Sequence, residues 1–240
     1  MAFVLLSGCH PEISTATLPA PQVWRVQVTP ALRWLGPVFN QCTLQAPQTS
    51  LLYSELPQPS LNPVQADFTL SLQPANGAVY SAVLGQVGLA LVVNPANPLT
   101  QLNASEVQSI LTGVFANWPE LPPADCAGCA RPPKGVIQPY IYPAGDDVGR
   151  LVQDLFPAQV EKLAGAILAP DPAAVRQAVA ADPGGIGFLP APWLDSSVRS
   201  VKIVGIPAEK LQIPIIFSAS AEPQAEKRSW LLCVQASLNK

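Results

Sequence analysis

Two stretches constrain the fold more than any others, because each has the punctuation expected of a chain that passes from one α/β unit to another. In the first, residues 84–118, a continuous apolar run ends at Asn94-Pro95 and a capped amphipathic helix follows. In the second, residues 178–190, a helix breaks at Pro183-Gly184-Gly185 and becomes a short apolar strand. Such punctuation predicts a chain that leaves one lobe and later returns to it.

The composition favours a packed, folded chain. Its 240 residues suffice for one large domain or for two lobes of about 100 residues each. Only 12% of residues are charged, against roughly 25% in average globular proteins. The net charge is −3 and no basic run occurs, which argues against a nucleic-acid partner. The single histidine, His10, lies near the N-terminus, so neither a histidine metal site nor a Ser-His-Asp triad is expected.

The N-terminus carries a motif that resembles a bacterial lipobox. Small residues precede a cysteine in Leu6-Ser7-Gly8-Cys9, although only eight residues stand before Cys9 and none of them is basic. An ordinary signal peptide has a basic start and about 7–15 apolar residues. We expect a lipid anchor on Cys9, with residues 1–22 forming the signal remnant and a tether. The alternative is a frayed apolar end with a free thiol.

The other cysteines are Cys42, Cys126, Cys129 and Cys233. In an exported chain, four thiols predict two disulfides. Cys126 and Cys129 stand close together in a proline-rich loop, which favours a local bridge and leaves Cys42 to pair with Cys233. Free thiols are the second interpretation. A zinc or redox role is disfavoured, because a lone CxxC motif has neither a second pair nor a nearby histidine.

Strand and helix candidates alternate along the chain. Strands are expected over residues 23–28, 51–55, 66–72, 86–93, 136–142, 186–189, 198–204 and 213–218. Helices are expected after Thr29-Pro30, over 79–84, after Asn103, after Gly145-Asp146-Asp147, over 158–168, over 173–180 and over 230–234. Asp171-Pro172 is expected to cap the helix over 173–180. This order predicts βαβ units with mainly parallel sheets.

Two motifs resemble type II periplasmic solute-binding proteins, in particular their phosphate-binding branch. The first is Asn94-Pro95-Ala96-Asn97-Pro98, followed by a helix, Gly113 and Trp118; the second is residues 183–188. The resemblance implies an α/β fold of two lobes, each a mainly parallel sheet flanked by helices. Lobe 1 would comprise residues 23–93 and 188–240, and lobe 2 residues 94–187.

The resemblance also implies a ligand held between the lobes by helix N-termini, which stabilise an anion. The family's Gly-Ser-Gly-Thr loop corresponds here to Gly145, Asp146, Asp147 and Val148. Two carboxylates about 4–5 Å from a bound dianion would cost several kcal/mol, so phosphate is not the expected ligand. The loop would suit a neutral or cationic ligand, or an anion site that has been lost. Alternatively, the two aspartates simply cap the helix.

Two further positions are candidates for the cleft. Thr29 either caps the helix that follows it or donates a hydrogen bond to the ligand. Asp67, in an Ala-Asp pair, resembles a strand end that faces the cleft and has no helix to cap.

The resemblance therefore implies a monomeric, lipid-anchored extracytoplasmic protein that closes around a small solute and delivers it to an ABC importer of the phosphate/oxyanion type. The altered loop leaves open a binding-protein-like surface adaptor or sensor without a transport role. An enzyme is disfavoured, because adjacent carboxylates at a helix start cannot flank one bond. No cofactor is expected.

Overall fold

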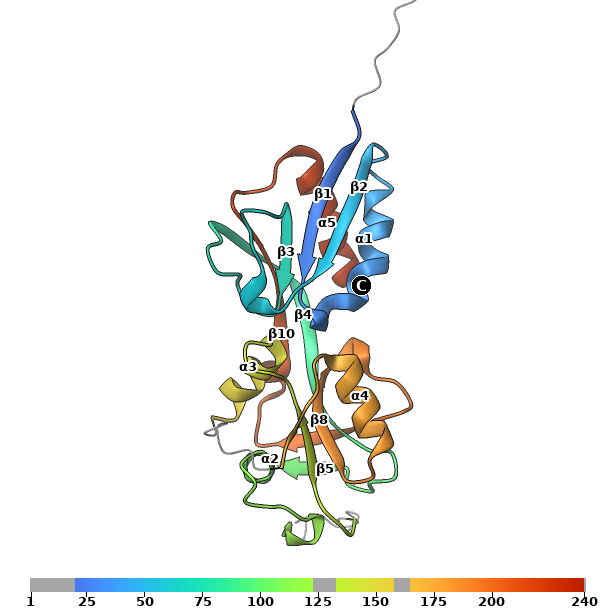
Figure 1. The fold of residues 1–240 in the computed structure, drawn as a ribbon, viewed down its shortest axis with the longest axis vertical. Helices are drawn as coiled ribbons and strands as arrows, with labels where there is room; N and C mark the ends of the chain where they lie inside the picture. Colours follow the sequence, from blue (N-terminus) through green and yellow to red (C-terminus); the bar gives the residue numbers. More distant parts are fainter. Residues whose placement is uncertain (1–19, 123–132, 158–164, 240) are drawn as a thin grey trace, which may run out of the picture.

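The computed structural model of the protein describes residues 20–122, 133–157 and 165–239, which form two lobes stacked along the long axis (Figure 1). The strands are β1 (Gln22–Val28), β2 (Thr49–Glu55), β3 (Phe68–Ser71), β4 (Tyr80–Val93), β5 (Gln101–Asn103), β6 (Gln138–Ile141), β7 (Ile167–Leu168), β8 (Gly185–Pro190), β9 (Arg199–Val204) and β10 (Gln212–Ala219). The helices are α1 (Gly36–Thr43), α2 (Ala104–Leu111), α3 (Asp147–Leu155), α4 (Pro172–Ala181) and α5 (Ala225–Leu238).

The long strand β4 belongs to both lobes. Its first part, from Tyr80 to Gly88, pairs with β10, and its second part, from Leu89 to Val93, pairs with β8 and β9. The expected helix over residues 79–84 is therefore wrong. Residues Tyr80–Val83 alternate between half-buried and exposed, as a strand beside β10 requires, and a short apolar segment alone does not distinguish the two structures.

The sheet order is β2-β1-β3-β10-β4-β8-β6-β7, with β9 joining β4 to β5. Pairing is parallel between β1 and its neighbours β2 and β3, between β6 and its neighbours β7 and β8, and between β5 and β9. Among the described strands, every antiparallel pairing involves β4 or β10. The expected α/β architecture is confirmed, and its antiparallel part is confined to the two strands that connect the lobes.

The strand pairing differs from the expected lobe boundary at residues 187 and 188. The whole of β8 lies between β4 and β6, and β9 pairs with β4 and β5, so both strands belong to lobe 2. The chain returns to lobe 1 at the start of β10, which pairs with β3 and β4. The apolar run after Gly184-Gly185 forms β8, which is buried along its whole length. This burial is explained by the central position of β8 in the lobe 2 sheet and not by a crossing between the lobes.

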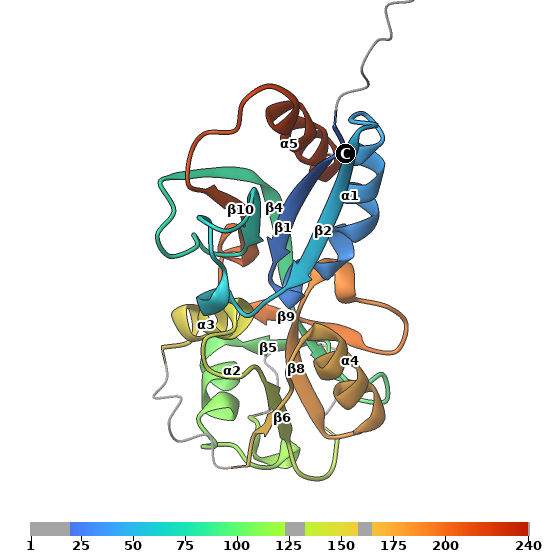
Figure 2. The same ribbon diagram turned by 45° about the horizontal axis from the view of Figure 1, so that its top comes forward.

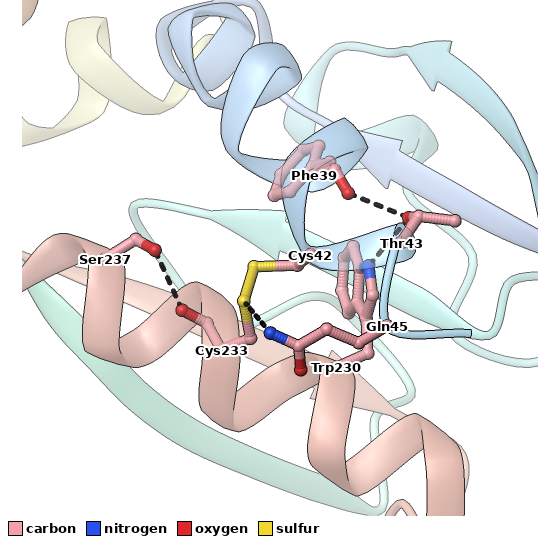
Figure 3. Close-up of a disulfide and its surroundings, with 7 residues drawn as sticks. All are labelled: Phe39, Cys42, Thr43, Gln45, Trp230, Cys233 and Ser237. Atoms are coloured by element: carbon pink, nitrogen blue, oxygen red, sulfur yellow. Dashed lines mark hydrogen bonds between the residues drawn. A yellow bond between two sulfur atoms is a disulfide. The ribbon is translucent and has the colours of Figure 1, made fainter. Parts of the chain in front are cut away.

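In lobe 1, α5 packs against α1 and closes the core (Figure 3). The ring of Trp230 lies 5.4 Å from that of Phe39, and its indole N–H donates to Thr43 Oγ1 at 3.0 Å. One turn further along α5, Cys233 forms a disulfide with Cys42, with the Cα atoms 5.7 Å apart. The bridge favoured for these two cysteines is confirmed, and it joins the first helix of lobe 1 to the last.

The remaining cysteines, Cys9, Cys126 and Cys129, lie outside the described residues, so the lipid anchor and the second bridge stay predictions. Within the described ranges, no helix has both the length and the apolar character needed to span a bilayer.

Replacing Cys42 and Cys233 by alanine should lower the free energy of unfolding by about 2–5 kcal/mol, since the bridge closes a loop between residues that are 191 positions apart. Urea unfolding followed by tryptophan fluorescence checks this. The wild type in reductant should match the double variant, and equal stability of the variant and the oxidised wild type would contradict the prediction.

Candidate functional site

The ends of two strands and the start of one helix lie close together where the two lobes meet. Thr29 follows β1, Leu72 follows β3, and Asp147 begins α3 of lobe 2. Because β1 and β3 are parallel neighbours, their carboxyl ends lie at the same edge of the lobe 1 sheet. Figures 1 and 2 both place α3 directly below that edge. We call the region of Thr29, Leu72, Asp146 and Asp147 the interlobe junction.

The carboxylate of Asp147 reaches from lobe 2 into lobe 1. Its Oδ2 accepts a hydrogen bond from Thr29 Oγ1 at 2.6 Å and another from the Leu72 backbone N–H at 3.1 Å. Its Oδ1 accepts from the Val148 backbone N–H at 3.0 Å. Thr29 is fully buried and Asp147 is 1% exposed, so water does not compete for these bonds.

Asp146 caps α3 and lies next to this carboxylate. Its Oδ1 accepts from the backbone N–H groups of Val148 and Gly149 at 2.9 and 3.1 Å. Burial raises the pKa of Asp146 to about 7, and the charge of Asp147 adds to the effect. Burial also raises the pKa of Asp147, whereas the hydrogen bond from Thr29 acts in the opposite direction. The junction therefore holds two buried acidic groups, one of which titrates near neutral pH.

A second set of bonds joins the lobes on the side of α4. Arg33, in the 3₁₀ helix that precedes α1, pairs with Asp171 at the start of α4, with 3.1 Å between Nη2 and Oδ2. The guanidinium also lies 5.7 Å from the centroid of the Trp193 ring. The Trp193 indole N–H donates to the Ala31 carbonyl at 2.9 Å.

A third set of contacts joins the lobes on the side of α3. Arg150 Nη1 donates to Gln73 Oε1 at 3.2 Å. Gly145 turns the chain into α3 with φ of +87°, and a Cβ atom there would lie 3.0 Å from Pro59 Cγ. Glycine suits this position for both reasons, because a side chain would be strained and would press on lobe 1. The lobes are thus in direct contact on both sides of Asp147.

The structure brings most of the predicted site residues together. Thr29 makes no side-chain cap bond to the helix that follows it; its hydroxyl is used across the junction instead. Gly145, Asp146 and Asp147 form the facing loop. The Val148 side chain is fully buried in the core, so this residue contributes only its N–H group.

Asp67 was expected in the cleft, and the structure places it just before the start of β3. Its carboxylate accepts from the Arg25 backbone N–H at 2.7 Å and pairs with Lys227, beside a surface hollow of about 420 Å³ in lobe 1. Asp67 precedes β3, and the five residues from it to Leu72 span roughly 16 Å of extended chain. The start of β3 therefore lies far from the junction, and its carboxyl end lies at it.

Sequence reasoning missed the contacts that Leu72, Arg33 and Asp171 make between the lobes. Leu72 contributes a backbone N–H, which no side-chain pattern reveals. The cap signature of Asp171 before Pro172 was visible, and Asp171 Oδ1 does accept from the Ala174 N–H at 2.8 Å. Its pairing with Arg33, however, depends on the placement of one lobe against the other.

No protein-family model matches the sequence, and neither does any curated protein. Solved structures do match the fold. A putative phosphate ABC transporter substrate-binding protein from Clostridium perfringens, solved with bound phosphate, has a TM-score of 0.73 at 17% identity, over 89% of this chain and 93% of its own. An ABC-type phosphate transport receptor from Vibrio cholerae has a TM-score of 0.64 at 16% identity, over 90% and 94%. The CcmR regulatory domain from Synechocystis, in complex with 2-PG, has a TM-score of 0.64 at 12% identity, over 90% and 97%.

These matches show that the chain has the two-lobed fold of type II periplasmic solute-binding proteins. The same architecture serves a transport receptor and a regulatory domain. The fold therefore does not distinguish transport from sensing, and a function has to be inferred from the residues of the interlobe junction.

Stability should fall as the pH rises from about 4 to about 7. The pKa of Asp146 is about 7 in the folded protein and near 3.8 for an aspartate exposed to water, as in the unfolded chain. Between these two pH values the folded state therefore binds more protons than the unfolded state. We expect a loss of roughly 1–4 kcal/mol in the free energy of unfolding, complete above the folded pKa. Denaturant unfolding across this pH range measures it.

The variant Asp146→Asn keeps an oxygen that can cap α3 and lacks the titration. Its stability profile should be flatter, and at pH 8 it should be more stable than the wild type. Asp154→Asn, an exposed change on the same helix, should leave the profile as it is. A profile of Asp146→Asn that runs parallel to the wild type would contradict the assignment.

Proposed function

We propose that the protein works outside the cytoplasm and captures a small neutral or cationic solute at the interlobe junction. The observation that carries this proposal is the convergence of Asp146 and Asp147 from lobe 2 with the donors of Thr29 and Leu72 from lobe 1. In the described part of the chain, no basic side chain forms an ion pair with either carboxylate. Two such groups favour a ligand that is cationic or rich in hydrogen-bond donors, and they disfavour phosphate.

The connection between the lobes supports capture by closure. β4 changes partners between Gly88 and Leu89, and β10 begins beside the same point. A tilt of one lobe about these two strands would open the junction and leave the pairing within each lobe in place. In this proposal the closed form is recognised by an ABC permease, and the protein is a monomer held at the membrane by a lipid on Cys9.

An oxidising location is supported by the disulfide between Cys42 and Cys233, since such bonds persist mainly outside the cytoplasm.

A second candidate is a surface adaptor or sensor without a transport role. The observation that favours it is that direct bonds already join the lobes, through Asp147, through Arg33 with Asp171 and through Arg150 with Gln73. A protein that stays closed without a solute would present one constant surface to a partner.

A thermal-shift screen of amino acids, polyamines and oxyanions against the wild type tests the proposed function. A cationic or neutral solute should raise the melting temperature progressively with its concentration, and inorganic phosphate should not. Asp147→Asn should weaken binding of that solute roughly 10–100-fold, because a hydrogen bond to a charged group is lost.

The matched control is Asp154→Asn, which should bind like the wild type. If phosphate were the solute that stabilises the protein, the proposed ligand class would be wrong. If no solute of any class shifted the melting temperature, the surface adaptor would be the better interpretation.

A further inference from the structure

The oxygens of Asp147 are surrounded in the way that a bound anion would be. Donors reach them from lobe 1 and from the adjacent residue: the hydroxyl of Thr29 at 2.6 Å, the backbone N–H of Leu72 at 3.1 Å and the backbone N–H of Val148 at 3.0 Å, which also donates to Asp146 Oδ1. Two of these donors belong to lobe 1 and the third to the first turn of α3. A helix start adds a favourable electrostatic environment for negative charge.

The donors of lobe 1 need an acceptor when the lobes are closed. Thr29 is fully buried, and Leu72 is 2% exposed, so neither group can turn to bulk water. Buried O–H and N–H groups without acceptors are costly and rare. In this structure one carboxylate oxygen of the other lobe, Asp147 Oδ2, accepts both hydrogen bonds.

We infer that Asp147 is an internal ligand, whose carboxylate occupies an anion position between the lobes and holds them closed when no solute is bound. The inference relies on the proposed function only for the location of the site. A cationic or donor-rich solute would then compete with Thr29 and Leu72 for the carboxylate of Asp147. Removing this side chain would leave a vacant position suited to a small carboxylate or oxyanion.

The test is chemical rescue of Asp147→Ala by acetate and by inorganic phosphate. It is best done at mildly acidic pH, because burial raises the pKa of Asp146 and a protonated carboxyl does not repel an added anion. The variant should melt below the wild type. Acetate or phosphate at millimolar concentration should raise its melting temperature in proportion to the logarithm of the anion concentration.

Two controls separate site binding from general salt effects. The wild type should not respond to either anion beyond the response to chloride at equal ionic strength, because its position is filled. Asp147→Asn keeps the volume of the side chain and should not respond either. A folded Asp147→Ala protein that gains no more from acetate or phosphate than from chloride would overturn the inference, as would an equal gain by the wild type.

Closure itself offers an independent measurement if Asp147→Ala does not fold. Thr29→Val removes the hydroxyl donor and keeps the branched shape. Small-angle scattering without solute should give a larger radius of gyration for this variant than for the wild type, and equal radii would count against an internal ligand. Failure of the proposed function alone would give a different result: the wild type would bind no solute, and the rescue of Asp147→Ala would still succeed.

Discussion

The sharing of β4 between the two lobes is the constraint on which the rest of the structure depends. The backbone groups of this one strand are satisfied by β10 in lobe 1 and by β8 and β9 in lobe 2, so neither lobe can detach without breaking a sheet. The partners change between Gly88 and Leu89, which leaves a short stretch where bending disturbs few hydrogen bonds. The carboxyl ends of β1 and β3 and the start of α3 face each other beside this stretch. The position of the interlobe junction is therefore a result of topology, and its side chains determine which groups it can bind.

Those side chains make closure a balance of opposing electrostatic effects. Burying Asp146 and Asp147 side by side is unfavourable, and the raised pKa values of both groups express that cost. The donors of Thr29 and Leu72 offset it, since they bond the charged form directly. The outlying pair of Arg33 and Asp171 is partly exposed and contributes modestly by comparison. The bonds of the Asp147 carboxylate are thus the most deeply buried of the contacts described between the lobes.

Local signals in the sequence predicted local structure well. The caps of α3 and α4 are made by Asp146 and Asp171 as their positions before the helices indicate, and Asn103 opens α2 in a capping box. The two-lobed fold was implied by the resemblance of residues 94–118 and 183–188 to type II periplasmic solute-binding proteins. Most of the errors concern partners rather than elements. The exceptions are the helix expected over residues 79–84, which lies in β4, and the end of the helix expected over 158–168, which forms β7. The place of β8 depends on its neighbours β4 and β6, and the exclusion of Asp67 depends on the direction of β3. The contribution of Leu72 is a backbone N–H, which leaves no trace in residue type.

The disulfide between Cys42 and Cys233 has a topological consequence. Both cysteines lie in lobe 1, and every residue of lobe 2 falls between them in the chain. The second lobe is therefore an insertion inside a covalent ring. A single proteolytic nick in any of its surface turns would yield two fragments still tethered through sulfur, and separating them would require reduction as well as unfolding.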